Sequence, residues 1–342
     1  MNKLVKKSII LASVALMSMA TLAGCKKEKK DYEDYIKLPT YKGIEIKKTD
    51  FEYTEAELME YINNGIENIC DAEKITDRPV EKGDIANIDY EGSVDGEKFE
   101  GGTATKFDLK IGAGKFIEGF EDGVIGMKSG EEKVLKLKFP DNYRETSLAG
   151  KACEFKVTLN EISRYPELSD EVVKELSDKF DNVADFKKDL KENLDQYSKE
   201  NLLWKNAMEK AEVKKFPDDS IETLLQQQLV NYTATAKSYN MTLAQYAQAL
   251  YGYTEEQFNK VLKEAIEAEQ KKYMLANAIA AKEGISVSDE DYEEYCKEYV
   301  ANSEDFASVA QFKEEVQKDD VLQAIVLDKA VKLIVDNCKI ID

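Results

Sequence analysis

The chain has 342 residues and a formal net charge of −20, with 48 Lys and Arg against 68 Asp and Glu. This length is typical of about two domains. The acidic balance argues against a nucleic-acid binder, because neutralising phosphates needs clustered Lys and Arg. The sequence contains no His, which excludes Ser-His-Asp and Cys-His catalysis and every metal site that needs an imidazole. No cofactor or metal is expected.

Residues 1–24 have the pattern of a secretory signal peptide. Basic residues precede an uncharged run from Ser8 to Gly24, which is marginally short for a membrane span of about 20 apolar residues. The run ends in Leu22-Ala23-Gly24-Cys25. This ending resembles a lipobox, which implies cleavage before Cys25 and diacylation of its sulfur. We therefore expect a lipoprotein on the extracytoplasmic face of the cell membrane, with a plain signal peptide or an anchor helix as the alternative.

Residues 25–40 are expected to form a lipid-anchored tether, because they are charged and show no hydrophobic periodicity. The Lys residues at 26, 27, 29 and 30 either lie near anionic lipid or belong to a hydrophilic spacer. The four remaining cysteines form no C-x-x-C pair, which argues against a zinc or thioredoxin-like site. They are Cys70, Cys153, Cys296 and Cys338. Their irregular spacing favours buried free thiols over disulfides.

Glycines mark a separate block within the chain. Residues 80–163 hold 12 of the 17 Gly, and this abundance predicts a β-rich domain with tight turns. Apolar residues alternate with polar ones at 86–90, 135–139 and 155–159, which predicts strands with one solvated face. Asp95-Gly96 predicts the turn of a hairpin.

The flanks of this block are predicted to be helical. Thr54-x-x-Glu57 is a capping box that precedes apolar residues on one helical face. Helical spacing also predicts helices at 186–204, after Pro217, from Phe258 to Gly284, after Ser288 and at 322–333. The short helix at 54–70 is expected to pack on helices after residue 166. The sequence therefore predicts an α+β protein with a β-rich block inserted into a helical body.

Ordered motifs in the β-rich block resemble an FKBP-type peptidyl-prolyl isomerase. The motifs are Val80–Asp84, Asp89–Gly92, Asp95–Gly102, Ile111–Glu121 and Gly123–Glu131. A series of ordered motifs over about 84 residues is far more specific than a lone Gly-rich loop.

The resemblance is closest to the trigger factor family and extends beyond the block over about residues 41–342. It includes Tyr41–Ile46, Pro166–Asp170, Val213–Pro217 and Gly284–Glu290. It implies an FKBP-like antiparallel β-sheet domain at 80–163, inserted into an all-helical chaperone domain with arms, which is built from 41–79 and 164–342. That family begins with a ribosome-docking domain that carries a basic loop, and no such segment is found here. A ribosome is therefore not an expected partner.

Carried over position by position, the resemblance implies a pocket with aromatic walls. Its residues are Tyr90, Phe99, Glu100, Phe107, Phe116, Ile117, Phe120, Tyr143 and Phe155. Phe120 matches the pocket floor, and Glu100 matches an acidic residue beside the second aromatic. Glu118 departs from the Pro usual in trigger factor, which puts the shape of the rim in doubt. For each aromatic residue, ordinary core packing is the alternative.

The resemblance implies a foldase that catalyses cis-trans isomerisation of X-Pro bonds and holds unfolded or nascent secreted polypeptides. Rotation about a peptide bond breaks no covalent bond, so it needs no nucleophile or imidazole. The absence of His is therefore compatible with this activity. Tyr and Met residues near 241–253 either hold such clients or pack helix on helix. One alternative is a non-catalytic chaperone or binding module that uses the same pocket and arms. Another is a solute-binding lipoprotein, but the long helical tail does not supply its two-lobe α/β pattern.

Overall fold

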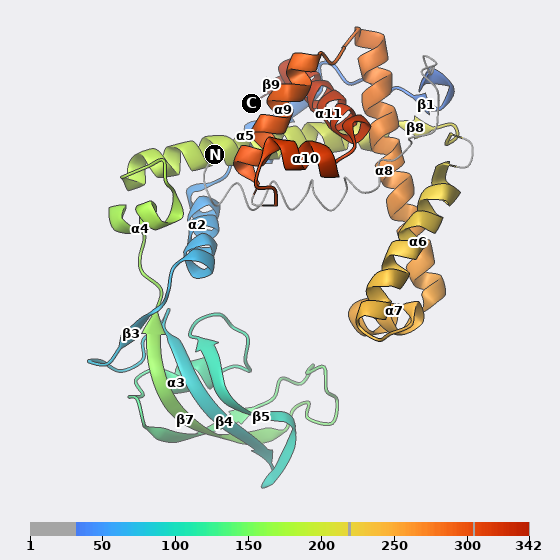
Figure 1. Cartoon of the computed structure of the whole chain (residues 1–342). Helices are drawn as coiled ribbons and strands as arrows, with labels where there is room; N and C mark the ends of the chain where they lie inside the picture. The colour runs from blue at the N-terminus through green and yellow to red at the C-terminus, as the bar shows by residue number, and fades with distance from the viewer. Residues whose placement is uncertain (1–31, 218–219, 304, 342) are drawn as a thin grey trace. The chain divides into compact units, whose positions relative to one another are not determined.

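The computed structural model describes residues 32–217, 220–303 and 305–341 (Figure 1). The predicted signal peptide and Cys25 lie outside these residues. The chain forms two compact units, one from Met1–Leu58 with Lys187–Asp342 and the other from Met59–Phe186. The boundaries fall within α2 (Glu55–Ile69) and α5 (Val183–Lys210). Within the described residues, no helix combines the length and the apolar character that a membrane span requires.

A five-stranded antiparallel sheet forms the centre of the unit Met59–Phe186. Its strands are β3 (Glu73–Ile75), β4 (Ile85–Val94), β5 (Glu97–Lys110), β6 (Glu132–Lys138) and β7 (Ala152–Arg164). β4 lies between β5 and β7, and both β6 and β3 pair with β7. The short helix α3 (Phe120–Val124) lies between β5 and β6 in the chain. Buried residues from the sheet and α3 form one hydrophobic core.

The turn that joins β4 to β5 follows directly from two residues. Asp95 and Gly96 both have positive φ angles, 52° and 83°. Paired positive φ angles at a two-residue connection match the right-handed twist of the flanking strands, and Asp-Gly tolerates them well. The predicted hairpin is confirmed.

Helix α2 begins at the predicted capping box. The Thr54 N–H donates to Glu57 Oε2 at 2.8 Å, and the Glu57 N–H donates to Thr54 Oγ1 at 3.3 Å. After this helix, the buried Cys70 thiol lies near Glu175 of α4 (Asp170–Leu176). Burial and the neighbouring Glu175 raise the pKa of this thiol to about 11. The contact joins the end of α2 to a helix beyond residue 166.

The other unit is mainly helical. Its helices are α5, α6 (Ser220–Ser238), α7 (Leu243–Tyr251), α8 (Glu255–Glu283), α9 (Asp289–Asn302), α10 (Val309–Glu315) and α11 (Lys318–Asp336), with 3-10 turns at Tyr32–Asp34 and Lys48–Asp50. Strand β1 (Ile36–Lys37) pairs antiparallel with β8 (Glu212–Val213), and β2 (Glu45–Lys47) pairs parallel with β9 (Lys339–Ile341). These pairings attach the early segment of the chain to the residues that follow α5 and to those that follow α11.

Predicted helix ends agree with the structure. Gly284 ends α8 with a φ of 70°, and the Ser288 side chain caps α9 by accepting from the Asp291 N–H. Helices α6, α7 and α8 lie against one another around their own hydrophobic cluster (Figure 1). Cys70, Cys153 and Cys296 are buried and Cys338 is half-buried, and all four are free thiols. The α+β class predicted from the sequence is confirmed.

Candidate functional site

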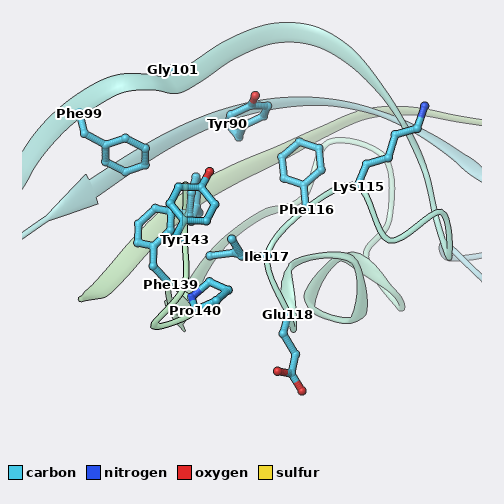
Figure 2. Close-up of a pocket in the computed structure, with 11 residues that line it drawn as sticks. Tyr90, Phe99, Gly101, Lys115, Phe116, Ile117, Glu118, Phe139, Pro140 and Tyr143 are labelled. Atoms are coloured by element: carbon cyan, nitrogen blue, oxygen red, sulfur yellow. The ribbon is translucent and has the colours of Figure 1, made fainter. Parts of the chain in front are cut away.

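A cavity of about 320 Å³ opens on the unit Met59–Phe186 (Figure 2). Its wall consists mostly of aromatic and apolar side chains. The residues that line it are Tyr90, Phe99, Gly101, Lys115, Phe116, Ile117, Glu118, Phe139, Pro140, Tyr143 and Phe155. They come from β4, β5, β7 and the two loops at 115–118 and 139–143.

Phe120 supports this cavity from below. The ring is fully buried and stacks on Phe116 with centroids 4.3 Å apart. It meets Phe155 edge-on at 5.1 Å. Edge-to-face and offset-stacked contacts are the favoured arrangements of aromatic rings, so the network holds the rings in fixed orientations.

Tyr90 connects the floor to the side wall. Its ring meets Phe107 at 5.9 Å and Phe116 at 5.5 Å, both edge-on. Burial raises the pKa of the Tyr90 hydroxyl. The hydroxyl is therefore protonated at neutral pH and can donate a hydrogen bond to a carbonyl in the cavity.

Phe99 owes its place to two glycines. A Cβ atom on Gly92 would come within 2.8 Å of the Phe99 ring, and one on Gly102 within 2.7 Å. These distances are shorter than real Cβ contacts, so only glycine lets the ring lie flat against the backbone of β4 and β5. Phe99 then meets Phe155 edge-on at 5.9 Å.

The loop that carries Phe116 and Ile117 is held by the Glu121 carboxylate. Glu121 Oε2 accepts from the N–H groups of Gly112 at 2.7 Å and Gly114 at 3.2 Å. Glu121 Oε1 accepts from the Lys115 N–H at 3.0 Å. Because Glu121 follows Phe120 in α3, one short helix fixes both the floor of the cavity and the loop that forms its wall.

A second loop closes the opposite side. Phe139, which is 2% exposed, meets Phe99 at 5.5 Å and Tyr143 at 4.8 Å. Pro140 also lines the cavity here. Figure 2 shows Tyr143 and Ile117 near each other, on two separate loops that line the cavity.

The structure brings six of the nine sequence-derived pocket residues into the lining. They are Tyr90, Phe99, Phe116, Ile117, Tyr143 and Phe155. Phe120 lies beneath the cavity, and Phe107 lies behind Tyr90 and is 36% exposed. Glu100 is exposed and does not line the cavity. The reason is geometric, because successive residues of a strand point to opposite faces and Phe99 occupies the inner one.

Sequence reasoning missed Gly101, Lys115, Phe139 and Pro140 as lining residues. A signal for Phe139 was available, since it continues the alternation of Leu135 and Leu137 on the face that turns to the core. Lys115 has no comparable signal, because a Lys in a Gly-rich loop is usually only solvated.

The cavity is suited to binding an apolar ring or side chain and excluding water from it. Aromatic walls dominate, and its hydrogen-bonding side chains are few. Among the described residues, no group of three or more Cys, Asp or Glu side chains lies close enough to hold a metal ion.

Comparison with known families agrees with this geometry. Residues 76–160 match the family of FKBP-type peptidyl-prolyl cis-trans isomerase. The sheet, α3 and the aromatic cavity thus define an FKBP-type domain. Residues 172–336 match the C-terminus of bacterial trigger factor protein, so the helical unit has a known relative too.

Two curated relatives cover most of the chain. Trigger factor from Staphylococcus carnosus is 36% identical over 318 residues, which cover 90% of this chain and 71% of the relative. Trigger factor from Halalkalibacterium halodurans is 31% identical over 317 residues, covering 89% and 73%. A solved structure of the trigger factor chaperone aligns with 88% of this chain and 72% of its own, at 22% identity and a TM-score of 0.36. The chain belongs to the trigger factor family.

Proposed function

We propose that the protein is an extracytoplasmic, lipid-anchored foldase that catalyses cis-trans isomerisation of X-Pro bonds and holds unfolded secreted polypeptides. The observation that carries the isomerase part is the aromatic cavity of the FKBP-type domain. Six residues inferred from the family pattern meet there around one space of about 320 Å³.

The reaction requires rotation about an amide bond with a barrier of about 18–20 kcal/mol, because resonance is lost as the bond twists. The planar amide has more charge separation than the twisted one. An apolar, water-poor cavity therefore stabilises the twisted amide relative to the planar ground state, and such differential binding lowers the barrier. In this mechanism the proline ring lies on the aromatic floor above Phe120. The Tyr90 hydroxyl, protonated at neutral pH, is available to a substrate carbonyl.

The isomerase proposal is tested with a blocked tetrapeptide that contains one X-Pro bond. Phe99→Ala and Phe120→Ala each remove an aromatic group worth about 1.5–3 kcal/mol of burial, which corresponds to a loss of roughly ten- to a hundredfold in kcat/KM. Val134→Ala is the matched control, because Val134 lies on β6 with 52% of its surface exposed. If the wild-type protein does not accelerate the exchange, the enzymatic proposal is wrong.

Holding of clients is supported by exposed apolar residues at the end of the α6–α8 group. Tyr239 is 64% exposed, Leu250 is 59% and Tyr251 is 47%. Large exposed apolar side chains that gather on one surface are typical of interaction sites. The same residues favour the alternative function, a chaperone whose pocket binds Pro-containing segments without catalysis. Suppression of client aggregation that survives Phe99→Ala, in a protein without isomerase turnover, would support that alternative.

The lipid anchor rests on the sequence around Cys25, which lies outside the described residues. Cys25→Ala should move the protein from the membrane fraction to the soluble extracytoplasmic fraction. Mass spectrometry of the mature wild-type protein should detect a diacylated N-terminal Cys. A wild-type protein with an intact first 24 residues, or with an unmodified Cys25, would contradict the lipoprotein proposal.

A further inference from the structure

Two opposite charges stand at the rim of an otherwise apolar cavity. Among the described residues that line it, Lys115 and Glu118 are the charged ones. Phe116 and Ile117 separate them in the chain. Figure 2 shows the Lys115 and Glu118 side chains leaving this loop in opposite directions.

Both charges are available to a ligand. The two side chains are exposed, and neither forms an ion pair with another residue that the structure describes. Elsewhere in the same unit, exposed Lys and Glu side chains pair with each other, as Lys156 does with Glu132 at 3.0 Å. Lys115 and Glu118 therefore have no ion-pair partner among the described residues that would neutralise them before a ligand arrives.

The backbone beneath these charges is fixed. The Lys115 N–H donates to Glu121 Oε1 at 3.0 Å, so the loop cannot swing freely at this residue. Glu118 precedes Gly119, which has a φ of 85° and leads directly into α3. A chain that places its proline over Phe120 meets a positive charge on one side of the 115–118 loop and a negative charge on the other.

We propose that Lys115 and Glu118 are specificity-determining residues that select X-Pro segments by the charges of the residues flanking proline. This inference rests on the proposed isomerase function and adds a substrate class to it. The preferred segments carry an acidic residue on one side of proline and a basic residue on the other, in one order. The reverse order places like charges together at both ends of the loop.

The expected effect is modest because the rim is solvated. Unit charges about 4–6 Å apart in water change binding by roughly three- to sixfold. Each contact is attractive in one order and repulsive in the other, and the effects of the two contacts multiply. Even a twofold effect per contact would separate the two orders by about sixteenfold, so a difference of about fivefold or more at low salt is a conservative threshold. In about 1 M salt the Debye length falls to about 3 Å, and the difference should largely disappear.

The experiment uses end-blocked peptides with Glu-Pro-Lys, Lys-Pro-Glu and Ala-Pro-Ala centres. NMR exchange spectroscopy on the full chain gives kcat/KM for each peptide, normalised to Ala-Pro-Ala so that general losses of activity cancel. The wild-type protein should prefer one charged order by about fivefold or more. The double variant Lys115→Glu/Glu118→Lys should prefer the opposite order. The control Lys156→Glu/Glu132→Lys swaps an ion pair between β6 and β7, keeps the net charge and should retain the wild-type order.

Failure of the inference and failure of the proposed function give different results. If the two orders are equal within twofold, or the rim swap keeps the wild-type order, the inference is wrong although the isomerase proposal stands. If no peptide is accelerated, the isomerase proposal is wrong. In that case the affinity of each peptide is measured by NMR titration, followed at the backbone amide signals of Phe116 and Ile117. These affinities test charge selection by binding alone. An inverted order of affinities in the rim swap supports it, and an unchanged order overturns it.

Discussion

Asp84 is the residue whose replacement should most clearly destabilise the FKBP-type domain. Its side chain is fully buried and accepts hydrogen bonds on both oxygens. Oδ1 accepts from Arg78 Nη2 at 2.9 Å and Arg164 Nε at 2.7 Å. Oδ2 accepts from Arg78 Nη1 at 2.7 Å and the Glu81 N–H at 2.8 Å. Arg78 precedes β4 and Arg164 ends β7, so the carboxylate ties together the two ends of the domain.

The perturbation is Asp84→Asn, which preserves the shape of the side chain. An amide has one acceptor oxygen, and its NH₂ group faces donors wherever it is placed. Either orientation loses two of the four bonds, each of them worth about 1.5–3 kcal/mol when a charged group takes part. Breaking a buried charged network by removing one partner typically costs about 3–5 kcal/mol. We expect a loss of that size in the free energy of unfolding of this domain.

The effect should depend on pH in a defined direction. Burial by itself raises the pKa of Asp84, but the bonds from Arg78, the Glu81 N–H and Arg164 outweigh it, so the pKa lies below its usual value. The unfolded chain has an Asp pKa of about 3.9. The carboxylate therefore stabilises the fold fully at pH values above this, and the stabilisation is lost as pH falls through the lower folded pKa. The difference between wild type and Asp84→Asn should shrink correspondingly in acid.

Hydrogen exchange with mass spectrometry on the full chain measures this locally. Peptides from β4 and β7 should exchange much faster in Asp84→Asn at pH 7. Asp95→Asn is the control, because Asp95 is exposed at the hairpin turn and Asn tolerates its positive φ. Unchanged protection of β4 and β7 in Asp84→Asn would refute the reasoning. It would mean that the cost of burying the carboxylate cancels the gain from its partners.

Three further predictions follow from single contacts. Gly92→Ala places a Cβ atom 2.6 Å from the Phe155 ring. This overpacking should lower the free energy of unfolding by about 1–3 kcal/mol, which thermal denaturation will measure, and it should lower isomerase activity in the peptide assay. Unchanged values for both would contradict the close packing. Glu121→Ala removes the acceptor of three loop N–H groups. Because one such bond is worth at least about 1.4 kcal/mol, the hydrogen-exchange rates of these amides, measured by NMR, should rise by about tenfold or more. Equal rates would show that the loop holds its shape without the carboxylate. Gly284 has a φ of 70°, and a Cβ atom there would meet nothing within 4 Å. Gly284→Ala should therefore lower the free energy of unfolding by about 1 kcal/mol through backbone strain alone. Gly284→Asn should lower it by less, and urea denaturation measures both.

Local patterns fixed many elements correctly because their signals lie within a few residues. The Thr54 capping box, the Asp95-Gly96 turn and the Gly284 helix end each depend on neighbours close in sequence. Such features are recognisable without tertiary contacts. Short elements were harder to recognise. Helices α7 and α10 have 9 and 7 residues, which is too few for a distinct helical period.

Family motifs identified most of the pocket, but not its boundary. Phe99, Phe116 and Ile117 were recognisable because their types and spacing follow the FKBP-type pattern. Glu100 is also part of that pattern, yet it lies on the outer face of β5. Phe139 and Lys115 reach the lining only because separate loops converge on one space, and no local signal encodes such convergence.

The sequence by itself determined the composition, the β-rich block between helical flanks and the chemistry of the candidate site. These depend on residue type and on spacing along the chain. Only the tertiary structure decided which side chains share a cavity, and that Glu121 binds the loop across from it. It also placed β2 in parallel beside β9, where Ile46 pairs with Ile340, 294 residues later in the chain.

The physical reason for this division is the range of the forces involved. Caps, turns and amphipathic periods follow from backbone geometry and from neighbours within a few residues. Cavities, buried charge networks and strand pairs between distant segments form only when the whole chain packs. The bonds of Asp84 to Arg78 and Arg164 span 6 and 80 residues, and the second of these could not be read from any local pattern.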